Sequence, residues 1–126
     1  MFIHLESIDQ AGHTHSWGSQ QYYDAVKIVD GYIGEIMDAY VKADIFDLTL
    51  FIIVSDHGGY GLDHKKFDEV CIRIPILAMG PRVRKGHTIT GYSSNVDVAP
   101  TVLHALGLQP GQFMVGKILE EVFFNS

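Results

Sequence analysis

Two short clusters of carboxylates and histidines hold the side chains of this sequence that are best suited to chemistry. The first is Asp9 with His13, four residues apart, and the second is the adjacent pair Asp56 and His57, which is followed by two glycines and then by His64. Carboxylate oxygens and imidazole nitrogens are the ligands that zinc accepts outside sulfur sites, at about 2.0–2.2 Å. The clusters therefore predict metal coordination, provided that the fold brings them together.

Each cluster also has a purely structural interpretation. An aspartate and a histidine that follow a strand often form a turn with a solvated histidine, and His64 lies in a polar, glycine-containing loop where solvation is equally common. The functional interpretation gains weight because both clusters follow predicted strands, and loops at strand ends frequently carry sites. All five side chains are therefore candidate metal ligands.

Two predicted strands would position these clusters. Residues 48–55 form an apolar run bounded by turn residues, as expected for a strand buried on both faces. In residues 2–8, apolar side chains alternate with polar ones, and Asp9 follows directly. This pattern predicts a second strand with Asp9 at its carboxyl end. Parallel pairing of the two would bring Asp9 and Asp56 to one sheet edge, where open α/β sheets bind their ligands.

One helix is predicted before the central strand in the sequence, and another is predicted after it. After a polar loop over residues 9–19, apolar side chains recur at spacings of three and four from residue 19 or 20 onward, which is typical of a helix packed on a sheet. A second helix is predicted over residues 96–106, capped by Ser94 or Asn95 and stopped by the glycine that follows.

The remaining segments complete the predicted fold. Residues 72–79 predict a strand that Pro75 makes irregular or places at an edge, residues 87–90 predict a short strand, and residues 118–124 form a final apolar segment. The order of elements predicts an α/β fold with a mainly parallel sheet flanked by helices. A chain of 126 residues suits a single domain over residues 1–126.

Composition excludes several classes of function. A net charge of −6 leaves no broad basic surface, so a nucleic-acid polymer is not an expected partner. No apolar run approaches the roughly 20 residues of a membrane-spanning helix. The single cysteine, Cys71, excludes an internal disulfide, and the first residues lack a signal-peptide pattern, so a cytoplasmic location is expected.

The order of motifs resembles the C-terminal half of the alkaline phosphatase superfamily, most closely its type I phosphodiesterase/nucleotide pyrophosphatase branch. The resemblance runs from about Phe2 to about Leu119. It consists of D-x-x-G-H, a long helix, a buried strand ending in S-D-H-G-G, a loop histidine, I-P-I-L-A-M-G-P and V-D-V-A-P-T-V-L-H-A-L-G-L. The D-x-x-G-H motif alone is weak, whereas S-D-H-G-G after a hydrophobic strand is a strong indicator.

The resemblance implies a metal-dependent hydrolase of phosphate esters or diesters, with two metal ions, usually zinc, and a small phosphate ester as substrate. Asp9, His13 and His64 match the ligands of one metal, because relatives with a compact loop place the third ligand at the loop histidine. Asp56 and His57 match two ligands of the second metal. In-line attack on phosphorus by a metal-activated threonine or serine is the implied mechanism.

The chain departs from the family pattern at its N-terminal side. The family's nucleophile and its remaining ligand to the second metal precede the matched segment, and no serine or threonine here takes the nucleophile's position. We therefore expect a truncated version with little turnover alone, and self-association through a sheet edge that further strands would cover. A non-catalytic metal-binding or interaction module, a sulfatase, a phosphotransferase and a mutase stay open as alternatives.

Overall fold

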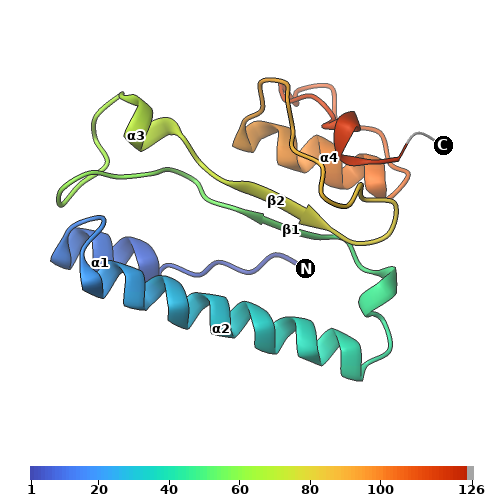
Figure 1. Cartoon of the computed structure of the whole chain (residues 1–126). Coiled ribbons are helices and arrows are strands. Elements are labelled where there is room, and N and C mark those ends of the chain that lie inside the picture. Colours follow the sequence, from blue (N-terminus) through green and yellow to red (C-terminus); the bar gives the residue numbers. More distant parts are fainter. Residues whose placement is uncertain (125–126) are drawn as a thin grey trace. The chain divides into compact units, whose positions relative to one another are not determined.

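The computed structural model describes residues 1–124, and its contacts group into two compact units (Figure 1). The first unit comprises residues 1–46 and 56–74, and the second comprises residues 47–55 together with the described residues from Pro75 onward. The prediction of a single domain over residues 1–126 stays a prediction, and its last two residues lie outside the described part of the chain.

The first unit is built on two helices that lie side by side, α1 (Ser7–His15) and α2 (Gln20–Lys42) (Figure 1). The hydroxyl of Ser19 accepts a hydrogen bond of 3.2 Å from the backbone N–H of Tyr22 and so caps the first turn of α2. The predicted start of this helix at residue 19 or 20 is therefore confirmed. A short helix, α3 (Glu69–Ile72), completes the unit.

The predicted strand over residues 2–8 and the predicted loop over residues 9–19 are wrong, because α1 occupies residues 7–15 and no strand forms before it. An alternating segment becomes a strand only where a neighbouring strand takes up its backbone hydrogen bonds. Residues 1–6 pair with no strand among the described residues, and the side chain of Phe2 is 88% exposed. A helix satisfies the next residues locally, with Asp9 in its first turn and two histidines in its last turn, which suits the helix dipole.

The second unit contains the sheet, which has two strands, β1 (Phe51–Val54) and β2 (Ile76–Met79). They pair antiparallel, with Phe51 opposite Met79 and Val54 opposite Ile76. The predicted parallel sheet is thus wrong for the described residues, since residues 2–6 of the segment expected to pair in parallel with β1 form neither strand nor helix and its last two residues begin α1. Gly80, at a φ of 139°, follows β2 directly, and a Cβ there would lie 2.4 Å from the carbonyl oxygen of Thr49.

Both strands are shorter than predicted, because helical turns occupy the neighbouring residues. The 3-10 helix η1 (Phe46–Leu48) takes the residues where the strand over 48–55 was expected to begin. Before β2 in the sequence, α3 extends to Ile72, and β2 begins only after Pro75. Proline has no N–H for the ladder, which favours a start after it.

The rest of the second unit surrounds a small apolar core of Val83, Leu119, Val122 and Phe123. Its main helix is α4 (Val98–Ala105), preceded by a 3-10 turn, η2 (Asn95–Asp97), and a further 3-10 turn, η3 (Glu120–Val122), lies near the end of the described chain. The predicted helix over residues 96–106 is therefore confirmed in type, with Gly107 just beyond its end at a φ of 73°. Ser94 caps the preceding 3-10 turn η2, whereas the N-cap residue of α4 is Asp97.

The short strand predicted over residues 87–90 does not form. The backbone N–H of Thr90 donates instead to a carboxylate oxygen of Glu121 at 3.0 Å, and the N–H of Gly91 donates to the other oxygen at 3.0 Å. A side chain thus takes the place that a neighbouring strand would have had. None of the described helices is both long and apolar enough to cross a membrane.

Candidate metal centre

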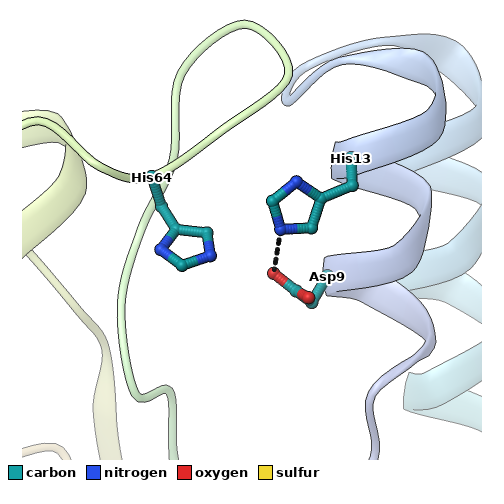
Figure 2. A group of neighbouring side chains, drawn as sticks. All are labelled: Asp9, His13 and His64. Carbon is teal, nitrogen blue, oxygen red and sulfur yellow. Dashed lines mark ion pairs between the residues drawn. The ribbon is translucent and has the colours of Figure 1, made fainter.

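Three candidate ligands converge in the first unit: Asp9 and His13 on α1, and His64 in the loop that precedes α3 (Figure 2). Because Asp9 and His13 are four residues apart on a helix, they lie one turn apart on the same face. One potential ligand atom from each of the three residues lies within 4.8 Å of those of the other two. The helix, and not the end of a strand, places Asp9 here.

The spacing of Asp9 and His13 and the chemistry of the three residues fit a metal ion. Two oxygen or nitrogen ligands at about 2.0–2.2 Å from a tetrahedral ion lie about 3.3–3.6 Å apart. His13 Nε2 lies 3.6 Å from Asp9 Oδ1. That oxygen is buried and accepts no hydrogen bond within the described residues, which is costly for a carboxylate unless another cationic partner occupies the position.

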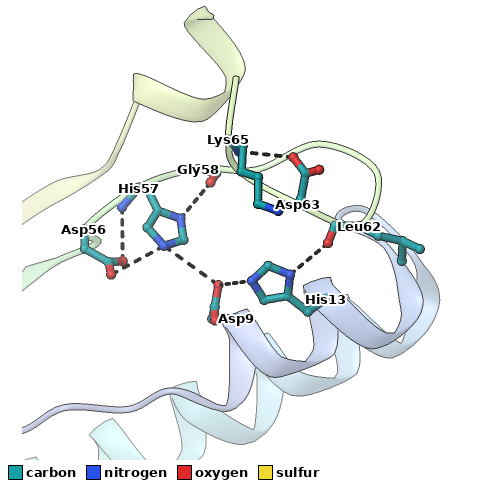
Figure 3. Close-up of polar contacts among 8 residues, drawn as sticks. All are labelled: Asp9, His13, Asp56, His57, Gly58, Leu62, Asp63 and Lys65. Atoms are coloured by element: carbon teal, nitrogen blue, oxygen red, sulfur yellow. Dashed lines mark hydrogen bonds and ion pairs between the residues drawn. The ribbon is translucent and has the colours of Figure 1, made fainter. Parts of the chain in front are cut away.

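A backbone carbonyl orients the His13 ring. His13 Nδ1 lies 2.8 Å from the carbonyl oxygen of Leu62 (Figure 3), and since a carbonyl can only accept, Nδ1 carries the proton. In the neutral ring, this leaves the lone pair on Nε2, which faces Asp9. Metal-binding histidines are commonly oriented by such a contact.

Ring contacts hold His64. Its ring stacks on that of His57, with centroids 3.7 Å apart and planes 18° apart, and it lies edge-on to His13 at 5.1 Å. Within the described part of the chain, neither nitrogen of His64 is hydrogen-bonded, so both remain available for an ion.

The second pair, Asp56 and His57, lies beside Asp9 (Figure 3). His57 Nδ1 donates to the carbonyl oxygen of Gly58 at 2.8 Å, which directs Nε2 away from its own backbone. That Nε2 lies 3.5 Å from Asp56 Oδ2 and 3.8 Å from Asp9 Oδ1. All five side chains singled out in the sequence thus gather in one place, although their assignment as ligands stays a prediction.

The glycine after His57 is required by the backbone that surrounds it. A Cβ on Gly58 would lie 2.1 Å from the carbonyl oxygen of Val70, and the N–H of Gly58 donates to the carbonyl oxygen of Cys71 at 2.7 Å. The backbone around Gly58 is thereby hydrogen-bonded to α3. Asp68 caps α3 by accepting a hydrogen bond of 3.1 Å from the backbone N–H of Cys71. Burial, and then Asp68, raise the pKa of the Cys71 thiol, as expected of a small packing residue.

The four remaining histidines do not belong to the cluster, and His4 among them is exposed. His15 lines a groove between α1 and α2, together with Thr14. His87 bonds to Glu121 at 3.2 Å, and the ring of His104 packs 5.7 Å from that of Phe123.

Two contributors to the site escaped sequence analysis. The Leu62 carbonyl carries no side-chain signature, so only the folded loop reveals it. Trp17 belongs to neither motif, and its sequence position alone leaves open whether it flanks a substrate or packs over the loop. The structure shows its indole packed against His13 and against Tyr22. Burial, followed by the charges of Tyr23 and Asp9, raises the pKa of Tyr22, which therefore stays a neutral phenol beside the cluster at ordinary pH.

Comparisons with known proteins show similarity to one family model and to several sulfatases. A family model described as type I phosphodiesterase / nucleotide pyrophosphatase matches residues 1–97. The chain is 34% identical to arylsulfatase K of Xenopus laevis over 103 residues, which cover 78% of this chain and 19% of that protein. It is 32% identical to human arylsulfatase K over 114 residues, which cover 83% of this chain and 21% of that protein.

A bacterial relative is equally similar. The chain is 32% identical to N-acetylglucosamine-6-O-sulfatase of Bacteroides thetaiotaomicron over 121 residues, which cover 88% of this chain and 22% of that protein. The chain therefore spans about a fifth of the length of the curated relatives that it matches. No solved structure matches it.

Proposed function

Since the chain belongs to the type I phosphodiesterase/nucleotide pyrophosphatase family of the alkaline phosphatase superfamily, we propose that it provides metal ligands for the hydrolysis of phosphoric esters. The observation that carries this proposal is the convergence of Asp9, His13 and His64, with potential ligand atoms within 4.8 Å of one another. The buried oxygen of Asp9, which accepts no hydrogen bond from the described residues, also supports it.

In this proposal each ligand has a defined task. Asp9 supplies the negative charge, His13 presents Nε2 because Leu62 holds Nδ1, and His64 approaches from the facing loop. A bound divalent ion, zinc by our expectation, would supply Lewis-acid activation of an ester oxygen. Asp56 and His57, on the other side of Asp9, would hold part of a second ion site.

The proposal does not extend to the attacking group. Thr14, the hydroxyl residue next to His13 in the sequence, lines the groove between α1 and α2 together with Ser7 and Gln10. We therefore propose that the chain contributes ligands but no nucleophile, and that alone it has little or no activity.

A sulfatase is the second candidate. It is favoured by the curated relatives, which are named arylsulfatase K and N-acetylglucosamine-6-O-sulfatase and are 32–34% identical to the chain. Phosphate and sulfate esters share a tetrahedral centre with charged oxygens, so a positively charged metal centre would suit either one.

Metal binding is tested by comparing two histidines of the same helix. We expect the wild-type chain to bind Zn²⁺ in isothermal titration calorimetry and His13→Ala to bind it more than about 100-fold more weakly, since even residues that only orient a ligand contribute 10–100-fold. His15→Ala is the matched control, because His15 lines the helix groove and should leave the affinity unchanged. Equal affinities for His13→Ala and wild type would refute the proposed centre.

Activity is tested with the purified chain, Zn²⁺, bis(p-nitrophenyl) phosphate and p-nitrophenyl sulfate. We expect little release of nitrophenol from either ester, because in our proposal the chain supplies metal ligands but no attacking group. Rapid phosphodiester cleavage that His13→Ala abolishes would show that a nucleophile is present after all. Cleavage of the sulfate ester alone would favour the sulfatase candidate.

A further inference from the structure

Trp17 joins the two segments that carry the candidate ligands. It lies two residues beyond the end of α1, and its backbone N–H donates to the carbonyl oxygen of Gly61 at 2.9 Å. Gly61 belongs to the segment over residues 56–64, here called the histidine loop, which carries His57 and His64. The connection is thus made inside the first unit, next to the cluster.

The indole of Trp17 packs against a glycine of each sequence motif. A Cβ on Gly12, from D-x-x-G-H, would lie 2.6 Å from Trp17 Cε2, and a Cβ on Gly59, from S-D-H-G-G, would lie 2.2 Å from the same atom. Neither distance is compatible with a real side chain, so both positions require glycine as long as the indole is present. The indole therefore fills the space between α1 and the histidine loop.

The same indole touches two candidate ligands. Its ring centroid lies 5.0 Å from that of His13, with an angle of 85° between the planes, and 6.0 Å from that of His64, with an angle of 72°. Edge-to-face contacts of this kind favour one ring orientation over others. They matter most for His64, whose ring is otherwise held by its contacts with His57 and His13.

We propose that Trp17 is a positioning residue for the metal centre: its indole sets the spacing between α1 and the histidine loop and thereby the arrangement of His13 and His64 around an ion. The inference rests on the proposed metal site. Because Trp17 is the single tryptophan of the chain, its fluorescence also reports directly on occupation of that site.

The first test measures Co²⁺ affinity and the visible absorption of bound Co²⁺, which depends on ligand geometry. We expect Trp17→Ala to weaken binding by about 10–100-fold, as residues that orient metal ligands do, and to change the absorption band. Trp17→Phe keeps an aromatic ring and should restore most of both. The packing control is Val29→Ala, which removes buried atoms from α2 in the same unit and should leave affinity and band unchanged.

The second test uses the wild-type chain and therefore does not depend on the folding of a variant. We expect Co²⁺ to quench the tryptophan emission in a saturable titration, and excess Zn²⁺ to restore it, because the indole packs against His13 and His64. The same titration with His13→Ala should show no saturable quenching.

The outcomes separate this inference from the proposed function. If the wild-type chain binds neither Co²⁺ nor Zn²⁺, both are refuted. If it binds Co²⁺ while the tryptophan emission stays constant, or if Trp17→Ala keeps the wild-type affinity and absorption band, the metal centre stands and the positioning role of Trp17 is refuted.

Discussion

Two carboxylates of this chain have opposite surroundings. Glu121 accepts hydrogen bonds at both oxygens, from the N–H and hydroxyl of Thr90, from the N–H of Gly91 and from the His87 ring, at 3.0–3.2 Å. Asp9 has a buried oxygen with no donor among the described residues. The first carboxylate is held by several hydrogen bonds, and the second has the environment that the proposed metal site requires.

Glu121 gives a prediction about acid stability. Hydrogen bonds from the backbone of Thr90 and Gly91 lower its pKa from 4.5 to about 2 in the folded chain. Their stabilisation is complete above the unfolded value of 4.5 and is lost as the pH falls through about 2. We expect Glu121→Gln to unfold at lower urea concentration than wild type near neutral pH, with a difference that shrinks between pH 4.5 and pH 2.

The control for this series is Glu120→Gln, which changes the same charge at the exposed neighbouring position. Urea unfolding of wild type and the two variants across that pH range separates the effect of the Glu121 hydrogen bonds on stability from a general effect of charge. A Glu121→Gln difference that grows on acidification, or that Glu120→Gln reproduces, would contradict the assignment.

At the scale of elements, helix ends proved more informative than strand patterns. The start of α2 is set by a short-range contact between Ser19 and Tyr22, and the start of α3 by one between Asp68 and Cys71. Residues 72–79 nevertheless suggested a longer strand, because an apolar run alone does not distinguish the end of a short helix from the beginning of a strand.

The capping contact of α2 can be tested directly. We expect Ser19→Ala to lower the free energy of unfolding by about 1 kcal/mol, because the N–H of Tyr22 loses its acceptor. Ser19→Asp keeps an acceptor at the same position and should retain most of the stability. The measurement is chemical denaturation followed by circular dichroism, and equal losses in both variants would argue against a capping role.

At the scale of the whole molecule, large apolar side chains are exposed in both units. Phe2 and Phe67 of the first unit are 88% and 96% exposed, and Phe113 of the second unit is 88% exposed. Each strand of the sheet also pairs on one side only among the described residues, which leaves edge hydrogen-bonding groups. Apolar surface and open edges of this kind favour association.

We therefore expect the purified chain to self-associate in a concentration-dependent way. Sedimentation velocity over a range of concentrations would measure it, and Phe67→Ser, which removes an exposed ring, should weaken it without changing the circular dichroism spectrum. A single monomeric species at all concentrations would contradict this prediction.

The sequence by itself determined the features that depend on neighbours a few residues away. The start of α2, the type of the helix containing α4 and its end at Gly107 follow from caps, periodicity and a glycine at positive φ. The candidate ligands were also recognisable, because their chemistry is a property of residue type and the motifs have a recognisable order.

Only the tertiary structure decided how those ligands meet. Strand pairing depends on partners far away in the sequence, so residues 2–8 could not reveal that no described strand accepts them, nor could residues 87–90 reveal that Glu121 takes their donors. The same holds for the site, where two parallel strand ends were expected. Asp9 and His13 lie instead on α1, and His13 contacts the Leu62 carbonyl and the Trp17 indole. Local patterns identify the residues, whereas long-range contacts set their arrangement.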